Sequence, residues 1–382
     1  MNKLNVFLFF IIIILGSTSA LSTNTYWETD IISFNKVSSL TEGDGNNVIV
    51  AVIDGGIIPG HKEFAPNFLW TNPHEIPGNN IDDDHNGYVD DIHGWNFVDN
   101  NSKTQPVPTG LDSNNNGIKD EYLDHATFIT GILIAKGLDM YRGLVPNIKI
   151  IDLRVFDTDG NDGGFDRIRS ALKYIISLKT NGVPVKVINY SLTNEFAQDN
   201  ETTQLISDLY NLGVLMVASS GNDRSSSRNF VGYPASLPDV IGVGAVDSQM
   251  QLADFSRYGA NLSLVAPGKN VYSTVHDNDY FTESGTSFSS PFVTGAIAFL
   301  YSLRPNLTIN QMKSILLNST TDLGTPGKDI YYGYGLLNVT NMLIEAGVNI
   351  YAPTNAPWPL YASSIAFILL IVIEKKSKFK KL

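Results

Sequence analysis

The chain has 382 residues, with 26 Lys or Arg against 38 Asp or Glu, a formal net charge of −12 and no cysteine. This acidity argues against binding to nucleic acid, so no nucleic-acid partner is expected. The length suffices for one large core of roughly 320 residues, which has to be stable through core burial and bound ions rather than through disulfides.

Residues 1–20 have the layout of a secretory leader. Lys3 precedes an apolar run over 6–15, and small residues follow as far as Ala20. The pattern predicts a signal peptide cleaved near Ala20, which directs the rest of the chain into the secretory pathway. An uncleaved N-terminal anchor is the alternative interpretation.

The first buried element is expected at residues 48–53, which are all apolar and lead into Asp54, Gly55 and Gly56. An unbroken apolar run of this length is typical of a strand covered on both faces, as in a parallel sheet. Active sites on such sheets lie at the carboxyl ends of the strands. Asp54 is therefore a candidate functional carboxylate.

Two acidic loops follow within residues 72–124, and both resemble the opening half of a calcium-binding loop. Oxygen-bearing side chains alternate, and glycine stands sixth. The candidate ligands are Asp82, Asp84, Asn86, Tyr88, Asp90 and Asp91 in the first loop and Asp112, Asn114, Asn116, Ile118, Asp120 and Glu121 in the second. His93 and Leu123 occupy the twelfth positions, so Asp91 or Glu121 would have to replace the usual glutamate. Solvated turns are the alternative interpretation.

His125 opens an apolar helical run that extends to Ile134, and strand-like and helix-like segments alternate after it. Strands are expected at 148–155, 185–191 and 213–218, and helices at 165–178 and 201–212. This alternation predicts βαβ units around a parallel sheet, and therefore an α/β fold. Asp54, Ser191 and Asn222 each follow a predicted strand, so we expect them at one edge of the sheet.

Ser287 lies in the small and hydroxyl-rich segment 285–291, directly before an apolar helical run over 292–300. It should sit at a helix N-terminus, where unpaired N–H groups favour a developing anion. A helix cap alone would give a similar pattern. However, a serine nucleophile needs a base and an orienting carboxylate, and the order Asp54, His125, Ser287 resembles that of the subtilisin-like proteases.

Six short blocks, in order and at fitting spacing, resemble the subtilisin-like serine proteases over residues 27–345. They comprise residues 54–56, 125–127, 219–223, 233–246, 255–268 and 285–291. The resemblance implies that the domain, 21–345, is a three-layer αβα sandwich with a mostly parallel central sheet. It also implies a monomeric serine endopeptidase that acts on proteins or peptides.

The same resemblance implies residue roles. Asp54, His125 and Ser287 would form a catalytic triad that works through an acyl-enzyme without a cofactor, and Asn222 would donate to the oxyanion. The walls of the substrate cleft would be formed by Ser191, Leu192, Thr193, Ser219, Ser220 and Gly221. Thr193 stands where the family commonly has glycine, so we expect a narrowed cleft.

Some features depart from the family pattern. Gly55 replaces a hydroxyl residue, Ala126 replaces a glycine, Phe128 replaces a frequent second histidine, and the usual pro-domain is not recognisable before Asp54. They leave a second hypothesis open, that of a membrane-tethered protein that binds through the cleft with weak or no turnover. An α/β-hydrolase lipase or esterase is disfavoured, because in that fold the serine precedes the other two residues.

The C-terminal residues predict a membrane anchor. Residues 346–357 form a linker, 358–373 an apolar membrane span, and 374–382 a lysine-rich cytosolic tail whose end resembles a dilysine retrieval signal. The order predicts a single-pass type I membrane protein with a luminal or extracellular catalytic domain. At about 16 residues the span is short, and a buried helix with a solvated basic end is the alternative.

Glycosylation is expected once the chain enters the secretory pathway. The acceptor pattern Asn-x-Ser/Thr occurs at Asn100, Asn200, Asn261, Asn306, Asn318 and Asn338. Asn189 also matches this pattern, but we exclude it because its strand should be buried.

Overall fold

The structure is a computed structural model that describes residues 26–37, 45, 47–110, 120–193, 198–225 and 228–350. The expected signal peptide, membrane span, basic tail and most of the second acidic loop lie outside these residues. In the part of the chain that is described, no helix has both the length and the apolar character needed to cross a bilayer.

Within the described residues, seven parallel strands form the central sheet, in the order β2-β3-β1-β4-β5-β6-β7. Their bounds are β1 (Ile49–Asp54), β2 (Gly94–Asn96), β3 (Lys149–Arg154), β4 (Val185–Tyr190), β5 (Leu215–Ser219), β6 (Val240–Val246) and β7 (Leu264–Pro267). β1 pairs with β3 on one side and with β4 on the other, and all six of its residues are buried because helices cover both faces of the sheet. This explains the unbroken apolar run and confirms the strand predicted there.

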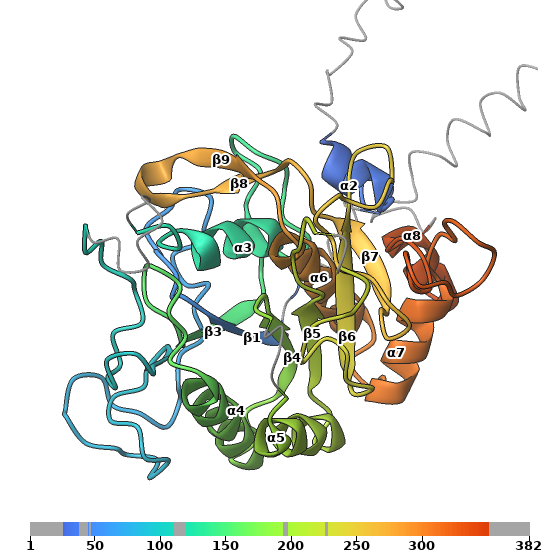
Figure 1. The fold of residues 1–382 in the computed structure, drawn as a ribbon. Helices are drawn as coiled ribbons and strands as arrows, with labels where there is room; N and C mark the ends of the chain where they lie inside the picture. The colour runs from blue at the N-terminus through green and yellow to red at the C-terminus, as the bar shows by residue number, and fades with distance from the viewer. Residues whose placement is uncertain are drawn as a thin grey trace, which may run out of the picture.

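Helices cover both faces of the sheet (Figure 1). One face carries α3 (His125–Ile134) and α6 (Thr286–Leu303), and the other carries α4 (Phe165–Thr180) and α5 (Asn200–Asn211). The shorter helices α2 (Trp27–Ile31), α7 (Ile309–Asn318) and α8 (Val339–Glu345) pack at the periphery. The three-layer αβα sandwich expected from the sequence is confirmed.

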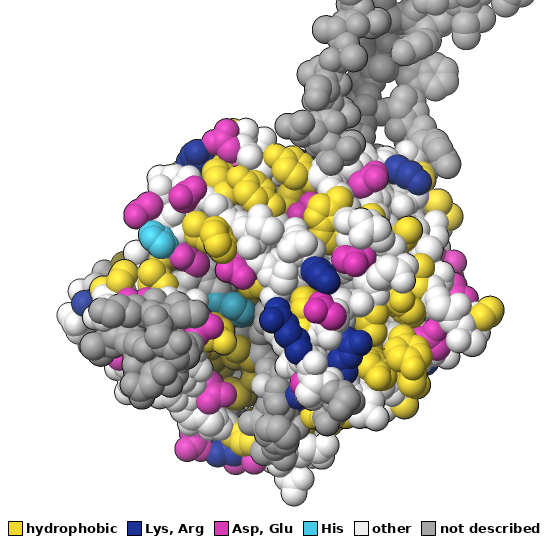
Figure 2. All heavy atoms as spheres, turned by 45° about the horizontal axis from the view of Figure 1, so that its top comes forward, with side chains coloured by type: hydrophobic (Ala, Val, Ile, Leu, Met, Phe, Trp, Pro, Cys, Tyr) yellow, Lys and Arg dark blue, Asp and Glu magenta, His cyan; other side chains and the backbone are white. Residues whose placement is uncertain are grey.

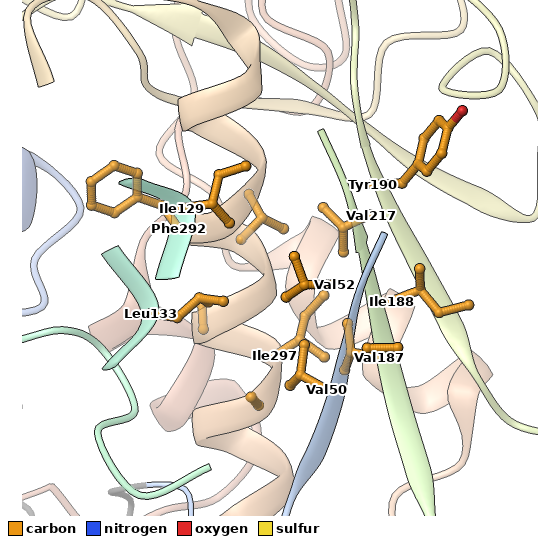
Figure 3. Packing of buried hydrophobic residues seen from close by; sticks show 14 of the residues in the cluster. Val50, Val52, Ile129, Leu133, Val187, Ile188, Tyr190, Val217, Phe292 and Ile297 are labelled. Carbon is orange, nitrogen blue, oxygen red and sulfur yellow. The ribbon is translucent and has the colours of Figure 1, made fainter. Parts of the chain in front are cut away.

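The core that supports the carboxyl edge of the sheet lies between the sheet and the pair α3 and α6 (Figure 3). Val187 points toward α6, whereas Ile188 and Tyr190 of the same strand lie on the other face of the sheet. Ile297 of α6 meets Val50 of β1 on the inner side, and all of these side chains are buried. Alternate residues of one strand thus fill both layers, which is why a parallel strand here has no polar face.

A hairpin formed by β8 (Val271–Thr274) and β9 (Tyr280–Glu283), with the short helix η2 (His276–Asn278) at its tip, lies over α3. Ser273 donates its hydroxyl to the carbonyl of Phe128 at 2.7 Å, and Thr274 donates to that of Thr127 at 2.8 Å. A Cβ atom on Gly131 would lie 2.3 Å from the Ser273 hydroxyl oxygen. The glycine is therefore needed for this close contact.

Candidate active site

His125 and Asp54 form a pair at the carboxyl edge of the sheet. Asp54 is the last residue of β1, and His125 is the first residue of α3. Nδ1 of His125 lies 2.9 and 3.0 Å from the two carboxylate oxygens of Asp54, which is 0% exposed. The backbone N–H of Gly55 donates to the same carboxylate at 2.7 Å. With Nδ1 held in this way, Nε2 is the ring nitrogen left for a reacting group.

Aromatic rings pack around His125. Its ring centroid lies 5.8 Å from that of Phe156 and 5.5 Å from that of Phe288, which in turn lies 4.4 Å from Phe128. A Cβ atom on Gly55 would come within 2.6 Å of the Phe156 ring. Gly55 and Phe128, which depart from the family pattern, therefore belong to one packing arrangement that holds the imidazole.

Ser287 is the second residue of α6, so its backbone N–H lies in the unpaired first turn of that helix. Its hydroxyl donates to the backbone carbonyl of Ser191 at 2.9 Å, and the Ser191 hydroxyl donates to the backbone carbonyl of Ser287 at 2.7 Å. These reciprocal bonds fix the start of α6 against the end of β4. Transfer of the hydroxyl proton to a base would require the Oγ–H to turn away from Ser191.

Asn222 is oriented by the same helix start. Its side-chain oxygen accepts from both the backbone N–H and the hydroxyl of Thr286, each at 2.9 Å. Its Nδ2 would lie 3.5 Å from a Cβ built on Gly285, which places the amide nitrogen next to the residues that precede Ser287. Because the oxygen is occupied, the NH₂ group of this exposed side chain is the free face of the amide.

Two cavities meet at His125, Asn222 and Ser287, and all three residues line both. The first cavity, of about 340 Å³, is also lined by Tyr122, Phe156, Gly160, Asp162, Ile168, Tyr190, Ser191, Leu192, Thr193, Ser219, Gly221 and Thr286. The second cavity, of about 500 Å³, is bounded by residues 121–128 and by residues 275–288 of the hairpin and the start of α6. An extended chain laid across both would pass the Ser287 hydroxyl.

Five of the six residues predicted to form the cleft walls line the first cavity. The exception is Ser220, which is fully buried and donates its hydroxyl to the backbone carbonyl of Arg257 at 3.0 Å. It supports the wall from behind rather than facing the cleft. Thr193 donates across the first cavity to the carbonyl of Ser219 at 2.8 Å.

The rim of the second cavity is acidic. Glu121, Asp124, Asp279 and Glu283 line it, and burial raises the pKa of Glu283. Asp124 pairs with Nδ1 of His276 at 2.7 Å, and this hydrogen bond raises the pKa of the imidazole. Figure 2 shows one histidine side chain in a hollowed part of this face and another on the surface nearby, each next to acidic side chains.

Comparison with known proteins agrees with this geometry. The sequence model of the Subtilase family matches residues 45–335. The chain belongs to the subtilase family. It is 38% identical to subtilisin DY of Bacillus licheniformis over 219 residues, which cover 56% of this chain and 76% of that protein. It is 31% identical to subtilisin NAT of Bacillus subtilis subsp. natto over 265 residues, which cover 65% of this chain and 67% of that protein.

A further relative, the subtilisin of Bacillus pumilus, is 31% identical over 265 residues, which cover 65% of this chain and 93% of that protein. These relationships make the chain a serine endopeptidase with a subtilisin-like fold, as the sequence motifs predicted. They give no support to the alternative of a membrane-tethered binding protein without useful turnover.

In this subtilase the first acidic loop brings three carboxylates together. Oxygen atoms of Glu75, Asp82 and Asp84 all lie within 4.8 Å of one another. Asp82 and Asp84 belong to the predicted loop, whereas Glu75 precedes it and is buried. Glu75 also accepts the backbone N–H groups of Asp83 at 2.8 Å and Asp90 at 3.0 Å, which ties it to the loop.

Other predicted ligands of this loop make different contacts. Asp90 accepts the backbone N–H groups of Gly78 at 2.7 Å and Asn80 at 3.0 Å. Asp91 is fully buried and accepts from Asn86 at 3.0 Å and from the Tyr174 hydroxyl. Burial raises the pKa of Asp91 to about 6. Neither residue belongs to the three-carboxylate cluster, and their role as ligands stays a prediction.

The remaining candidates of this loop are also engaged locally. The side-chain oxygen of Asn86 accepts the backbone N–H of Tyr88 at 2.8 Å. The Tyr88 ring packs edge-on against Trp95 and Tyr174, at centroid distances of 5.0 and 4.9 Å. The roles of Asn86 and Tyr88 as ligands stay a prediction.

The second loop is described only at its end. Asp112, Asn114, Asn116 and Ile118 lie outside the described residues, and Glu121 lines the second cavity. Asp120 accepts the backbone N–H groups of Thr109 at 2.9 Å and Gly110 at 2.7 Å. Although desolvation opposes it, hydrogen bonding from Thr109, Thr158 and Gly110 holds the pKa of Asp120 at about 2.

Sequence reasoning missed Glu75 and Phe156. Glu75 stands seven residues before Asp82 with no regular spacing that links them, and loop closure alone brings them together. Phe156 follows β3 and resembles any core aromatic residue. A glycine directly after the Asp54 strand was the available signal, because it implies that another side chain occupies the space beside it.

Most of the predicted glycosylation sites are exposed in the structure. Asn189 is 0% exposed, in agreement with its exclusion. Asn338 caps α8, since its side-chain oxygen accepts the backbone N–H of Asn341 at 2.9 Å, and its amide donates to Thr321 at 3.0 Å. The remaining sites are exposed, namely Asn100, Asn200, Asn261, Asn306 and Asn318.

Proposed function

We propose that the chain hydrolyses peptide bonds through Ser287 as nucleophile, His125 as general base and acid, and Asp54 as the group that orients the imidazole. The contact of His125 Nδ1 with both oxygens of the buried Asp54 carries this proposal. It selects the tautomer with the proton on Nδ1, which leaves Nε2 to accept a proton. Ser287 shares both cavities with that imidazole.

The reaction proceeds in two halves. The Ser287 oxygen attacks the substrate carbonyl carbon while its proton passes to Nε2 of His125, and the resulting imidazolium is stabilised by Asp54. Collapse of the tetrahedral intermediate breaks the C–N bond, and His125 gives the proton to the leaving amine. Water then attacks the acyl-enzyme with the same base, which releases the acid and regenerates the hydroxyl of Ser287.

Asn222 and the backbone N–H of Ser287 would stabilise the oxyanion. The support for this role is the fixed amide oxygen of Asn222, which leaves Nδ2 as a preorganised donor. Donors that need no reorientation as charge develops contribute strongly, and removal of such an amide lowers kcat by about 10²–10³ in subtilisin itself. The backbone N–H of Ser287 would be the second donor, because it lies in the unpaired first turn of α6, where the helix dipole favours a negative charge.

Turnover of an unfolded protein substrate tests the proposal. The full chain should cleave casein, and Ser287→Ala and His125→Ala should each lower the rate by at least about 10³ while the variants stay folded. Thr320→Gly is the control, because Thr320 lies outside both cavities. Casein that binds the folded wild type but stays intact would favour a binding role instead.

We also propose a structural calcium ion at Glu75, Asp82 and Asp84. Three converging carboxylates fit a hard divalent cation, because such a cation would offset their mutual repulsion. These residues would hold the ion and fix the loop, with no part in the chemistry at Ser287.

For the location of the protein, we propose entry into the secretory pathway through residues 1–20. The apolar residues 358–373 would then span the membrane, and the lysine-rich residues 374–382 would remain on the cytosolic side. Support comes from residue order alone, in which an apolar run precedes a basic flank. The catalytic domain would lie on the luminal or extracellular side.

A further inference from the structure

Two short segments form facing walls at the floor of the first cavity. Ser191, Leu192 and Thr193 follow β4, while Ser219 and Gly221 belong to the end of β5 and the segment after it. β4 and β5 are adjacent and parallel, with Tyr190 paired to Ala218. Neighbouring strands lie about 4.8 Å apart, so the gap between the walls is narrow where they begin and must widen to admit a side chain.

The Thr193 side chain crosses this gap. Its hydroxyl donates to the backbone carbonyl of Ser219 at 2.8 Å and lies 3.0 Å from the Ser219 hydroxyl. Its methyl carbon would lie 3.1 Å from a Cβ built on Gly221, so it occupies the space in front of the opposite wall at Gly221. Ser219 is 2% exposed, which makes the acceptor carbonyl part of the rigid sheet edge.

We propose that Thr193 closes the lower part of the pocket for the P1 residue, the residue whose carbonyl is attacked, and restricts cleavage to substrates with a small P1 side chain such as glycine, alanine or serine. The inference rests on the proposed function, since it takes Ser287 as the nucleophile. It assigns the substrate class of that site and makes Thr193 a specificity-determining residue.

The physical reason lies in the branched Cβ atom. The Thr193 hydroxyl bonds to the opposite wall, its methyl group fills the space beside Gly221, and β-branching restricts rotation of the side chain. A large P1 side chain would have to break the bond to the Ser219 carbonyl and leave that buried acceptor unsatisfied. A side chain of alanine size stays above the bridge.

The rest of the first cavity does not compensate for this closure. Its volume of about 340 Å³ is shared with a separate wall formed by Phe156, Ile168 and Tyr190. Phe156 follows β3, Ile168 belongs to α4 and Tyr190 is the last residue of β4, and we assign this wall to substrate residues before P1. The choice of P1 residue can therefore be measured independently, with the preceding substrate residues held constant.

The test compares two peptide 4-nitroanilides that differ only in P1, alanine or phenylalanine, on the full chain. The wild type should cleave the alanine substrate with a kcat/KM at least about 10-fold higher. Thr193→Gly should raise the phenylalanine-to-alanine ratio of kcat/KM at least 10-fold. Thr193→Ala, which keeps a Cβ atom but removes both bridging atoms, should shift the ratio in the same direction.

The control is Thr320→Gly. The Thr320 hydroxyl also donates to a backbone carbonyl, that of Tyr334 at 2.6 Å, but lies outside the cleft, so the ratio should not change. Each protein is also labelled with a fluorophosphonate. Labelled wild type that cleaves both substrates equally, or an unchanged ratio in both Thr193 variants, would overturn the P1 assignment and leave the proposed nucleophile in place. Folded wild type that neither labels nor cleaves would overturn both.

Discussion

Asp152 is a buried acid one strand away from Asp54, the carboxylate of the proposed triad. It lies on β3 opposite Val52 of β1, and it is 1% exposed. One carboxylate oxygen accepts the backbone N–H of Ile57 at 3.1 Å, while the other has no hydrogen-bond partner among the described residues. Burial, with a further contribution from Asp54, raises the pKa of Asp152 to about 6, although Thr104 and Ile57 donate to it.

This residue predicts a fall in stability as the pH rises. An acid whose folded pKa is raised binds its proton more tightly when folded, so its stabilising contribution is present below the unfolded value of 3.8 and is lost as pH passes about 6. The loss amounts to roughly 3 kcal/mol. Asparagine cannot ionise at this position. In urea unfolding, the free energy of unfolding of Asp152→Asn should therefore rise relative to that of the wild type by about 2–3 kcal/mol between pH 4 and pH 7.

Asp30→Asn serves as the matched control for Asp152, because Asp30 is exposed on α2. Its free energy of unfolding should keep a constant offset from the wild type over the same pH range. A constant offset for Asp152→Asn as well would show that Asp152 does not titrate in this range.

Single residues also show where sequence reasoning is strong. Asp54, His125, Asn222 and Ser287 stand in short motifs because their backbone positions, at strand ends and helix starts, need particular neighbours. The hydroxyl of Ser287 directed at the Ser191 carbonyl was not predictable, since a rotamer leaves no mark in the sequence. The substitution at Thr193 predicted a narrower cleft, but the bond across it to Ser219 required coordinates.

At the scale of elements, the contact between α3 and β8 holds the helix that begins with His125. Gly131→Ala would force its new methyl group against the hydroxyl oxygens of Ser273 and Thr274, at 2.3 and 2.4 Å. We expect the melting temperature to fall, because overpacking of about 1–3 kcal/mol exceeds the gain of up to about 1 kcal/mol in helix propensity.

A glycine elsewhere provides the comparison for Gly131. Gly60 has no atom within 4 Å of a Cβ built on it, so Gly60→Ala should leave the melting temperature unchanged or slightly higher. Equal melting temperatures for Gly131→Ala and the wild type would contradict the close contact between helix and hairpin.

The first acidic loop predicts calcium-dependent stability. A cation that binds only the folded state adds about 2.7 kcal/mol at 100 times its Kd, so a chelator should lower the melting temperature of the full chain by about 5 °C or more. Asp84→Asn should reduce this difference. Asp83→Asn should retain it, because Asp83 lies outside the three-carboxylate cluster and accepts the backbone N–H of Ile76 instead.

Unchanged melting of the wild type after addition of a chelator would contradict the calcium proposal.

The first acidic loop also shows which contacts cannot be predicted from residue spacing alone. Asp82 and Asp84 were predicted from alternation, but Glu75 joins them through a turn whose closure depends on many backbone hydrogen bonds, among them that of Asp83 to Glu75. Asp91 faces the Tyr174 hydroxyl of α4, a tertiary contact that no loop motif encodes.

For the molecule as a whole, the sheet was the most predictable feature. Apolar runs such as that of β1 mark strands buried on both faces, and their alternation with amphipathic helices indicates a doubly covered parallel sheet. The strand order was not predictable in detail, because β2 is only three residues long and lies inside the acidic region. Its pairing with β3 depends on Gly94, whose φ of 127° and close approach to Asp152 suit glycine alone.

The proposed membrane anchor makes a prediction about the intact protein. The full chain should remain in the membrane pellet after alkaline carbonate extraction. Ile368→Arg with Leu369→Arg should release it, because each arginine near the middle of a span costs about 2.5–3.5 kcal/mol on insertion. Release of the wild type by carbonate alone would contradict a spanning segment at 358–373.

Fluorophosphonate labelling followed by peptide mapping is the most direct test of the proposed triad. It requires an activated serine and reports which one reacts. We expect a single adduct on Ser287 in the folded full chain, none in Ser287→Ala, and labelling slowed by at least about 100-fold in His125→Ala. A folded wild type without an adduct, or with an adduct on another serine, would contradict the assignment of Ser287, His125 and Asp54 as a working triad.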